Sequence, residues 1–493
     1  MRPRNYFSKY IPLIIALLIC LVISLIPFKI LSHGYLPGDD ALRHAGKAVS
    51  GKDWHQILML RDEIKMDAHI GWNTILRAVY KTTKWDTLSL VIFSVTALFI
   101  LFSLTGALLL RRPEAWLLAL LAVCIADMGL IFRLLLGRPY IVTMSAILAL
   151  YMVWPRLKNK KTPYGIIAIL TAVVAAATWI HCAWFLFAVP VASFFFAREW
   201  RAGFRVSAAV IIGIAIGVTL TGHPILFLKQ VIFQTFFLIG LGANSSARIL
   251  VSEQQPATGD FPIVIVMALA LIWRTLRGAW DRKSLENPVF MLLASSWVLG
   301  FFTIRAWLDL GIPAVTLCLA LEFQDFLETR MGYLSWKRVA LTVISMYILY
   351  SAVTNDSNSR WSNCHPRGYL LADNPEHAPW LPEPGGILYS DDMDMFYTTF
   401  YKNPSAPWRY MLGDSPMFMP KEDFEIYSNI LRTHGPRNSF APWVKKMKPQ
   451  DRLILFNPPD KKPDIPELEW HNIPDIVWSG RLPKNQKNVL DKK

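Results

Sequence analysis

The segment from Leu36 to Trp72 carries two adjacent aspartates, Asp39 and Asp40, near its start, and it lies between two apolar runs long enough to span a bilayer. We expect Asp39 to cap the next helix and Asp40 to lie in its first turn, where the helix dipole favours negative charge. Four residues on, Arg43 can face Asp39 and His44 can face Asp40. A carboxylate at a membrane surface can accept the proton of an acceptor hydroxyl. The alternative interpretation of the pair is an ordinary acidic helix start.

Further ionisable residues lie near the ends of apolar segments. Such a group in or beside a membrane span is costly and therefore a functional candidate, although side chains at span ends also reach the interface readily. A guanidinium binds phosphate oxygens bidentately, so arginines facing carboxylates at one membrane surface suit a lipid that carries a phosphate. The candidates are Asp67 and His69 in the same segment, Arg138, His181 and His223 between later spans, and Arg305 with Asp309. Asp127 and Arg133, within one span, indicate instead an intramembrane structural pair.

The composition is that of a membrane protein. Of the 493 residues, 53% are hydrophobic and 18% are charged, and the mean hydropathy is +0.33. The net charge of +15 lies outside the region from Asp356 onward, where 18 Lys and Arg balance 18 Asp and Glu. Basic loops between apolar spans indicate topology rather than a nucleic-acid partner. Four of the five cysteines lie in apolar runs, and neither a disulfide framework nor a metal-ligand spacing is present.

Hydropathy and the positive-inside rule together predict about eleven membrane spans. The spans are Ile11 to Ile30, Leu88 to Leu110, Ala115 to Leu136, Tyr140 to Trp154, Tyr164 to Ile180, Ala183 to Ala197, Val206 to Thr221, Phe261 to Trp273, Pro288 to Thr303, Ala306 to Leu321 and Val339 to Val353. The first is expected to be retained, since no Ala-x-Ala cleavage site follows it. The apolar stretch Ile225 to Leu241 carries three polar residues on one face, which predicts an interfacial or re-entrant helix.

The charged loops set the expected orientation. Five of them carry Lys or Arg and share a side with the basic N-terminus, which predicts that this side is cytoplasmic. They are Arg111-Arg112, Arg156 to Lys161, Arg198 to Arg205, Arg274 to Lys283 and Glu322 to Arg338. With eleven spans, the first loop (residues 32–87) and everything after Asn355 then face outward. The membrane part is expected to cover residues 1–355.

Residues 356–482 are expected to form a soluble domain. Strands are predicted from Gly385 to Asp391, from Trp408 to Leu412 and from Arg452 to Asn457. Helices are predicted from Met393 to Tyr401 and from Lys421 to Thr433, which indicates a small α/β layer. It contains no P-loop and no Gly-x-Gly-x-x-Gly motif, so no nucleotide site is indicated. The Lys- and Asn-rich tail, residues 483–493, is expected to be disordered.

The first loop resembles a known family. Asp39-Asp40-Ala-Leu-Arg43-His44-Ala45, followed by Gly51-Lys-Asp53-Trp54, is similar to the pattern that opens the first periplasmic loop of the protein mannosyltransferase and aminoarabinose transferase group, within the GT-C membrane glycosyltransferases. The resemblance implies that Asp39 is the catalytic or catalysis-supporting carboxylate and Asp40 the neighbouring acid. It also implies a donor sugar carried on a polyprenyl phosphate. Asp67 lies where the family has a second acid, but the Lys-Pro-Pro that usually follows that acid is absent.

The leading hypothesis is therefore an inverting GT-C-type glycosyltransferase of the bacterial cytoplasmic membrane. It would transfer a sugar from a polyprenyl-phosphate donor to an extracytoplasmic glycan, lipid or protein. Asp39 would act as or orient the general base, with Asp40 or Asp67 assisting. Arg138 and Arg305 would hold the phosphate, and Arg43, His44, His69, His181 and His223 complete the expected substrate site.

Three questions stay open at the level of sequence. Mg²⁺ or Mn²⁺ would suit Asp39, Asp40 and Asp67 if a metal takes part, because hard cations prefer carboxylate ligands. A transporter or flippase of a lipid-linked precursor is a second hypothesis, although such proteins are expected to show repeat symmetry and charges at mid-membrane. An inactive GT-C-like scaffold that binds glycolipid is a third.

Overall fold

Apolar helices form most of the chain as far as Thr354. The computed structural model describes residues 9–238, 255, 261–276, 278, 286–363, 368–413, 415–433, 435, 437–458, 460–474 and 476–483. The helices of this bundle are α1 (Ile11–Leu31), α5 (Thr87–Leu109), α6 (Pro113–Ala126), α7 (Gly129–Leu135), α8 (Tyr140–Met152), α9 (Trp154–Leu157), α10 (Tyr164–Ile180), α11 (Ala188–Phe196), α12 (Trp200–Thr219), α13 (Pro224–Ile232), α15 (Phe261–Leu276), α16 (Pro288–Gly300), α17 (Ile304–Ala306), α18 (Ile312–Arg330) and α19 (Trp336–Thr354). Cys364 and residues 484–493 lie outside the described part.

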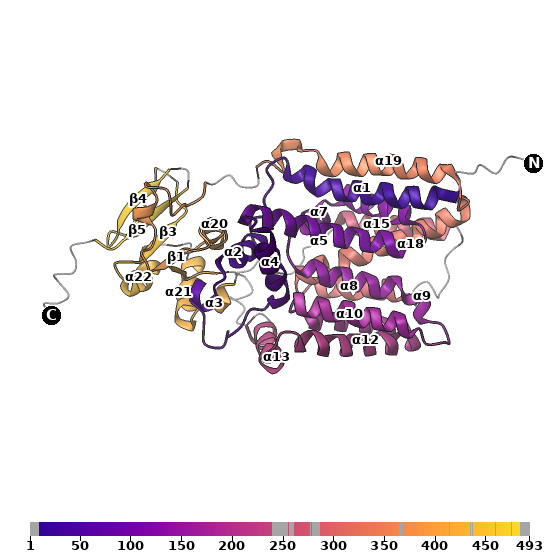
Figure 1. The fold of residues 1–493 in the computed structure, drawn as a ribbon, viewed down its shortest axis with the longest axis horizontal. Coiled ribbons are helices and arrows are strands. Elements are labelled where there is room, and N and C mark those ends of the chain that lie inside the picture. The colour runs from indigo at the N-terminus through magenta and orange to yellow at the C-terminus, as the bar shows by residue number, and fades with distance from the viewer. Residues whose placement is uncertain are drawn as a thin grey trace, which may run out of the picture.

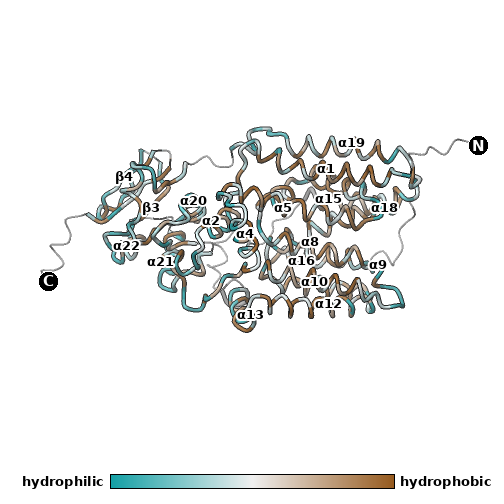
Figure 2. The backbone as a smooth tube through the Cα atoms, viewed as in Figure 1, coloured by the Kyte–Doolittle hydropathy of each residue, from teal (hydrophilic) through white to brown (hydrophobic). Residues whose placement is uncertain are grey.

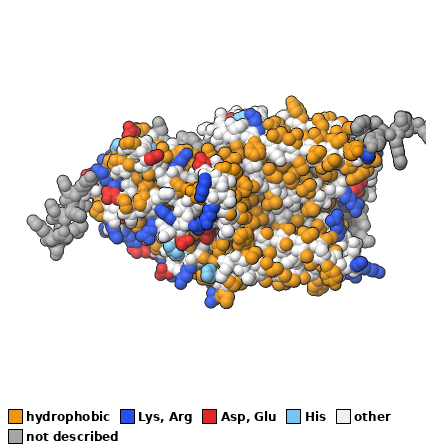
Figure 3. Space-filling model, in the orientation of Figure 1, with side chains coloured by type: hydrophobic (Ala, Val, Ile, Leu, Met, Phe, Trp, Pro, Cys, Tyr) orange, Lys and Arg blue, Asp and Glu red, His pale blue; other side chains and the backbone are white. Residues whose placement is uncertain are grey.

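The bundle has the surface of a membrane domain. In α1, isoleucines at helical spacing such as Ile15 and Ile19 are buried, whereas leucines such as Leu13 and Leu17 are more than half exposed. A helix that is apolar on its exposed face as well is suited to lipid rather than water. Figure 2 shows apolar residues along the bundle helices, and Figure 3 shows a wide apolar band with charged side chains gathered at its two ends.

The expected count of eleven spans is not confirmed. Among the described residues, four helical segments are long and apolar enough to cross a membrane, and a fifth is if α6 and α7 form one span. The other apolar helices are shorter, including α8, α10, α11, α15 and α16. The third predicted span is also not continuous, because the chain bends by 107° between α6 and α7. At that bend, the Asp127 carboxylate accepts a hydrogen bond at 2.9 Å from the N–H of Gly129, the first residue of α7.

Four of the five basic loops lie at one end of the bundle, away from the first loop (Figure 1), whereas most of the fifth, Arg274 to Lys283, lies outside the described residues. Arg112 donates to the Met331 carbonyl at 2.9 Å, and Arg205 donates to the Leu157 carbonyl at 2.6 Å. Beside them, the buried Arg338 forms an ion pair with Glu114 at 2.5 Å. Charged groups at this end are thus paired where they meet the apolar helices.

The C-terminal domain is a mixed sheet with helices on both faces. Its strands are β1 (Ile387–Ser390), β2 (Arg409–Tyr410), β3 (Arg452–Leu455), β4 (Glu469–Ile473) and β5 (Val477–Arg481), in the order β2-β1-β3-β5-β4. The first three are parallel, and β5 runs antiparallel to β3 and β4. The helices are α20 (Met393–Lys402), α21 (Lys421–Arg432) and α22 (Arg437–Lys446). The hairpin β4–β5 and α22 were not expected from the sequence.

Alternate residues of β1 and β3 divide the domain into two cores. Leu388 and Ile454 pack in one cluster with the apolar face of α20, whereas Tyr389 and Leu453 pack in the other with α21 and α22. This alternation is the period of a strand that is buried on both faces. The α20 face is the one that meets the bundle, so the domain is placed by a helix that also contacts the first loop (Figure 1).

The first loop is held between the bundle and this domain. It contains α2 (Asp40–Ser50), α3 (Trp54–Ile57) and α4 (Ile70–Thr83), and α2 packs against α4, α5 and α20. Beyond α3, Leu58 forms a parallel bridge with Tyr410 at the β2 edge, and Met59 N–H donates to the Tyr410 carbonyl at 2.9 Å. The Arg61 guanidinium donates to the Met417 carbonyl at 3.1 Å. The loop therefore adds its backbone to the β2 edge of the sheet, and it is held by contacts with both the bundle and the C-terminal domain.

The contact between α2 and α20 depends on a glycine. A Cβ atom at Gly46 would lie 3.0 Å from the Phe400 ring and 3.2 Å from the Phe400 carbonyl oxygen. We predict that Gly46→Val destabilises the protein by about 1–3 kcal/mol, the usual cost of overpacking, and loosens the C-terminal domain. Gly165→Val is the matched control, because nothing lies within 4 Å of a Cβ there. Thermal unfolding and limited proteolysis check this, and equal behaviour of the two variants would contradict the packing.

Candidate active site

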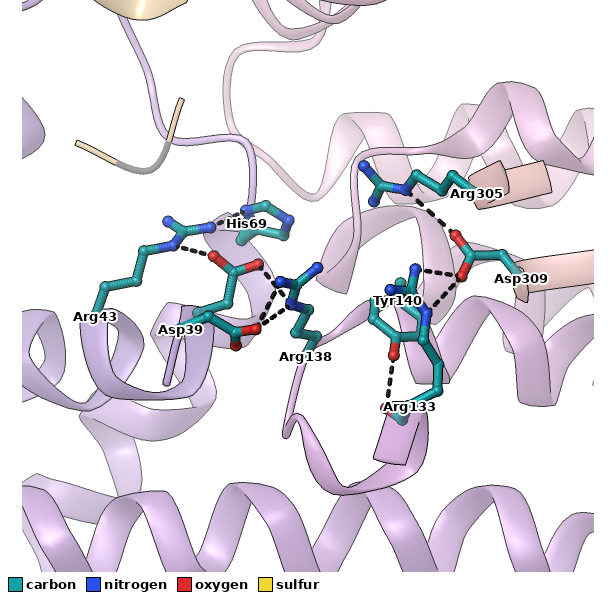
Figure 4. Close-up of polar contacts among 9 residues, drawn as sticks. Asp39, Arg43, His69, Arg133, Arg138, Tyr140, Arg305 and Asp309 are labelled. Atoms are coloured by element: carbon teal, nitrogen blue, oxygen red, sulfur yellow. Dashed lines mark hydrogen bonds and ion pairs between the residues drawn. The ribbon is translucent and has the colours of Figure 1, made fainter. Parts of the chain in front are cut away.

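The candidate residues gather where the first loop meets the bundle. Asp39 is the residue before α2, and Arg138 lies in the turn between α7 and α8. Asp39 was expected to cap α2, but its side chain makes no capping hydrogen bond. Instead, the carboxylate faces Arg138, as Figure 4 shows. The cap was predicted wrongly because a guanidinium from another part of the chain attracts the carboxylate more strongly than the backbone amides do.

The pair of Asp39 and Arg138 is short and partly shielded from solvent. Arg138 donates to Asp39 Oδ2 from Nη2 at 2.6 Å and from Nε at 3.1 Å. Its Nε also lies 3.6 Å from Asp40 Oδ2, so one guanidinium serves both aspartates. The Asp39 and Arg138 side chains are each 17% exposed. This leaves the pair accessible to a ligand while most of its surroundings exclude water.

Asp40 is held by a second arginine. Arg43, which is 2% exposed, donates from Nε to Asp40 Oδ1 at 2.7 Å. The sequence predicted Arg43 as the partner of Asp39 and His44 as the partner of Asp40, each four residues on. In the structure Arg43 instead pairs with Asp40, three residues before it. Burial alone would raise the pKa of Asp40, but the charges of Arg43 and Arg138 outweigh it and hold that pKa well below its usual range. Asp40 is therefore ionised at neutral pH.

Asp67 is joined to the same cluster through a lysine. Lys47 donates to Asp67 Oδ2 at 2.8 Å, and the His69 N–H donates to Asp67 Oδ1 at 2.9 Å. Asn73 also donates to Asp67, and its amide oxygen lies 2.7 Å from His44 Nδ1. Burial alone would raise the pKa of Asp67. The charge of Lys47 and the hydrogen bonds to the carboxylate outweigh this effect and lower the pKa, so the carboxylate stays charged. The contacts make Asp67 an anchor that fixes α2 against the start of α4.

Three histidines form a row beside these carboxylates. The His44 and His69 rings meet edge to face at 5.2 Å, and His69 stacks on His181 at 5.7 Å between ring centroids. His69 Nδ1 lies 3.5 Å from Arg43 Nη2, and His181 Nδ1 lies 2.9 Å from the Thr143 hydroxyl. Burial and the Arg43 charge lower the pKa of both His44 and His69 to about 3, so both rings are neutral at physiological pH.

A second charged group lies further into the bundle (Figure 4). Asp309 is in a π-helical turn (Trp307–Gly311) before α18 and is 2% exposed. Arg133 donates to its Oδ1 at 2.7 Å from Nη2, and Arg305 donates to its Oδ2 at 3.3 Å from Nε. Arg133 was expected to pair with Asp127, but that carboxylate is bound at the bend between α6 and α7. The two arginines share one carboxylate, which leaves this group with a net positive charge.

His223 alone of the expected residues is not joined to this network. It is exposed at the start of α13, and the described contacts link its backbone only to Thr221 and Phe227. Four unpredicted residues take part instead: Lys47, Asn73, Tyr140 and Thr143. The only signal for them in the sequence was helical spacing, with Asn73 four residues after His69 and Thr143 three after Tyr140.

The residues present do not fit a metal site. Asp39, Asp40 and Asp67 are each bound by a cationic side chain, at 2.6, 2.7 and 2.8 Å respectively. No group of three or more His, Cys, Asp or Glu side chains within the described ranges converges as ligands would. The carboxylates are therefore neutralised by arginine and lysine, and no step of the chemistry is assigned to a metal.

The buried histidines give the protein a characteristic acid sensitivity. An unfolded histidine has a pKa of about 6.5, so between that value and about 3 the unfolded chain binds the extra protons. The contribution of these histidines to the free energy of unfolding is fully present above about pH 6.5. It is lost as the pH falls, by up to about 1.4 kcal/mol per pH unit for each histidine. We predict that the thermal midpoint falls from pH 7 to pH 5 and that His69→Gln lessens this fall. His55→Gln, at an exposed position, is the control, and an unchanged slope in His69→Gln would contradict the assignment.

Comparison with known proteins identifies the fold. No protein-family profile and no curated protein sequence matches the chain. The solved structures that are similar to it include two that match nearly all of this chain. One is ArnT from Cupriavidus metallidurans bound to undecaprenyl phosphate, with 13% identity, a TM-score of 0.55 and coverage of 97% of this chain and 99% of that one. The other is the Archaeoglobus fulgidus oligosaccharyltransferase in the apo form, with 13% identity, a TM-score of 0.51 and coverage of 92% and 70%.

Both neighbours are members of the GT-C superfamily, as the resemblance of the first loop had implied. They are membrane proteins, which agrees with the apolar helices of this chain. The chain therefore shares the fold of these two structures, and at least four of its described helical segments are long and apolar enough to cross a membrane.

Proposed function

We propose that this protein is an inverting glycosyltransferase that moves a sugar from a polyprenyl-phosphate donor to an extracytoplasmic glycan, lipid or protein. The observation that carries the proposal is the ion pair of Asp39 and Arg138, in which Oδ2 and Nη2 are 2.6 Å apart. The pair lies at the end of the apolar bundle that contacts the first loop. A base for an acceptor hydroxyl and a cation for a phosphate meet there. One of the similar proteins was solved with undecaprenyl phosphate bound, which supports this class of donor.

The chemistry follows from these two groups. Asp39 takes the proton of the acceptor hydroxyl as that oxygen forms a bond to the anomeric carbon of the donor sugar. The bond between this carbon and the phosphate oxygen breaks, and the phosphate leaves with the electron pair. Its charge rises in the transition state, where a guanidinium stabilises it more than in the ground state. Arg138 can share its donors between Asp39 and the phosphate, so arrival of the donor releases Asp39 to act as the base.

Arg305 is the second proposed phosphate ligand. The Arg305 side chain is 40% exposed, whereas the neighbouring Arg133 side chain is 5% exposed and lies inside the bundle. Asp309 neutralises only one of the two, which leaves a cation to receive an anionic group. His69 and His181, together with Arg43, offer hydrogen-bonding groups to the sugar beside this phosphate position.

The proposal includes a topology. Eleven spans would place the N-terminus in the cytoplasm and the first loop and C-terminal domain outside a bacterial cytoplasmic membrane. The grouping of the basic loops at the opposite end of the bundle supports this orientation.

The first test removes the base. Asp39→Asn keeps the volume but loses charge and basicity, so we expect transfer of a labelled sugar from its polyprenyl-phosphate donor to fall at least about a hundredfold. Asp62→Asn, an exposed change in the same loop, should leave transfer intact. Product formation by purified, reconstituted protein with an acceptor extract is the measurement.

Two results of this assay would contradict the proposal. Near-normal turnover of the Asp39→Asn variant would mean that Asp39 only orders the loop. Movement of label across the bilayer with no new glycosidic product, in the unmodified protein, would assign a transporter instead.

The topology has its own test. Reporters fused after Asp356 and within residues 39–86 should report the outside, and one at Lys158 should report the cytoplasm. The reason is that the basic loops are retained on the cytoplasmic side. A cytoplasmic signal from the position after Asp356 would overturn the orientation.

A further inference from the structure

The C-terminal domain contains a cavity that takes no part in the proposed transfer reaction. It has a volume of about 440 Å³ and is lined by Asp391, Asp392, Met393, Tyr427 and Phe456. Its size falls in the range of small-molecule sites, roughly 300–1,000 Å³. Two of the five lining residues are carboxylates, two are aromatic, and none is basic.

The position of the cavity in the sheet is that of a ligand site. Asp391 and Asp392 directly follow β1, and Phe456 directly follows β3, its parallel neighbour. From these adjacent strands the chain leaves in opposite directions, since β1 is followed by β2 on one side and β3 by the β4–β5 hairpin on the other. In open α/β sheets, the crevice at the carboxyl ends of such strands is where ligands bind.

A buried phenol provides a second, independent indication. Tyr427 on α21 is 3% exposed and stacks on Trp443, yet it lines the cavity. No hydrogen bond joins its hydroxyl to any residue in the described part of the chain. A tyrosine hydroxyl on a side chain that is otherwise buried usually has a hydrogen-bond partner. The cavity is thus the place from which this hydroxyl would gain one.

The charge of the cavity selects the ligand. Asp392 accepts a hydrogen bond from the Asp394 N–H at 2.9 Å, so it offsets the partial positive charge at the start of α20. The neighbouring Asp391 adds a second carboxylate. Burial raises the pKa of Asp391 to about 6, and the charge of Asp392 adds to this effect. A cation in the cavity would relieve both the burial and the repulsion.

We propose that this cavity binds a small hydroxylated ligand through a primary ammonium group, held by Asp391 and Asp392 with the Tyr427 hydroxyl as a further partner. The Tyr427 and Phe456 rings supply flat apolar walls, on which a cation or the C–H face of a sugar ring packs favourably. Both an amino sugar and an amine-bearing lipid headgroup have this chemistry. The site stands whether or not the bundle transfers sugars.

The test compares probes that differ in charge. Saturation-transfer NMR on the purified full chain in detergent, at neutral pH, would be titrated with glucosamine, glucose and ethanolamine. We expect saturable binding of glucosamine and at least about tenfold weaker binding of glucose, because glucose lacks the ammonium group. Tighter binding of glucosamine than of ethanolamine assigns an amino sugar, and the reverse order assigns a headgroup; both orders uphold the ammonium site.

Matched variants locate the binding. Asp391→Asn should weaken glucosamine binding at least about tenfold, and Tyr427→Phe should weaken it roughly two- to tenfold through one lost hydrogen bond. Asp373→Asn, an exposed change in the same domain, should bind as the unmodified chain does, and thermal unfolding verifies that each variant folds. Equal affinity for glucose and glucosamine, full binding by Asp391→Asn, or no saturable binding of either amine would overturn the proposal.

Discussion

The ion pair between Asp39 and Arg138 is the interaction on which the site depends. Both groups lie at the end of an apolar bundle, where an uncompensated charge costs several kcal/mol. The pair is met from one side by Asp40 and Arg43, and the interior arginine Arg133 finds its own carboxylate in Asp309. Satisfying each charge in this way fixes the groups in place. A reaction that moves a proton and creates a phosphate dianion requires such an ordered field.

The C-terminal domain makes this arrangement possible by holding the first loop. Gly46 lets α2 approach Phe400 closely, and Leu58 adds its backbone to the β2 edge. A long loop without such contacts would lose the geometry of its carboxylates, because a site needs rigid support. The sheet therefore contributes to the bundle site by position, while its own cavity lies at the carboxyl ends of β1 and β3.

Local patterns predicted much of this fold and less of the site. The helix expected from Met393 to Tyr401 is observed as α20 (Met393–Lys402), because apolar periodicity and an acidic start are local properties. Asp39 and Arg138, in contrast, are 99 residues apart, and only the packing of α2, α5 and α8 brings them together. The capping role expected for Asp39 failed for the same reason, since a distant guanidinium competes with local amides. The bend at Asp127 likewise could not be predicted. A single carboxylate within an apolar run is compatible both with a continuous membrane span and with a break between two helices.

The most direct test of this account is the position of the lipid phosphate. An experimental structure of the full chain with undecaprenyl phosphate bound would show it. The account predicts that the phosphate lies against the Arg138 or Arg305 guanidinium, with Asp39 turned toward the acceptor side. A phosphate bound at the opposite end, beside Arg112 and Arg338, with the Asp39–Arg138 pair undisturbed, would contradict the claim that this ion pair is the catalytic centre.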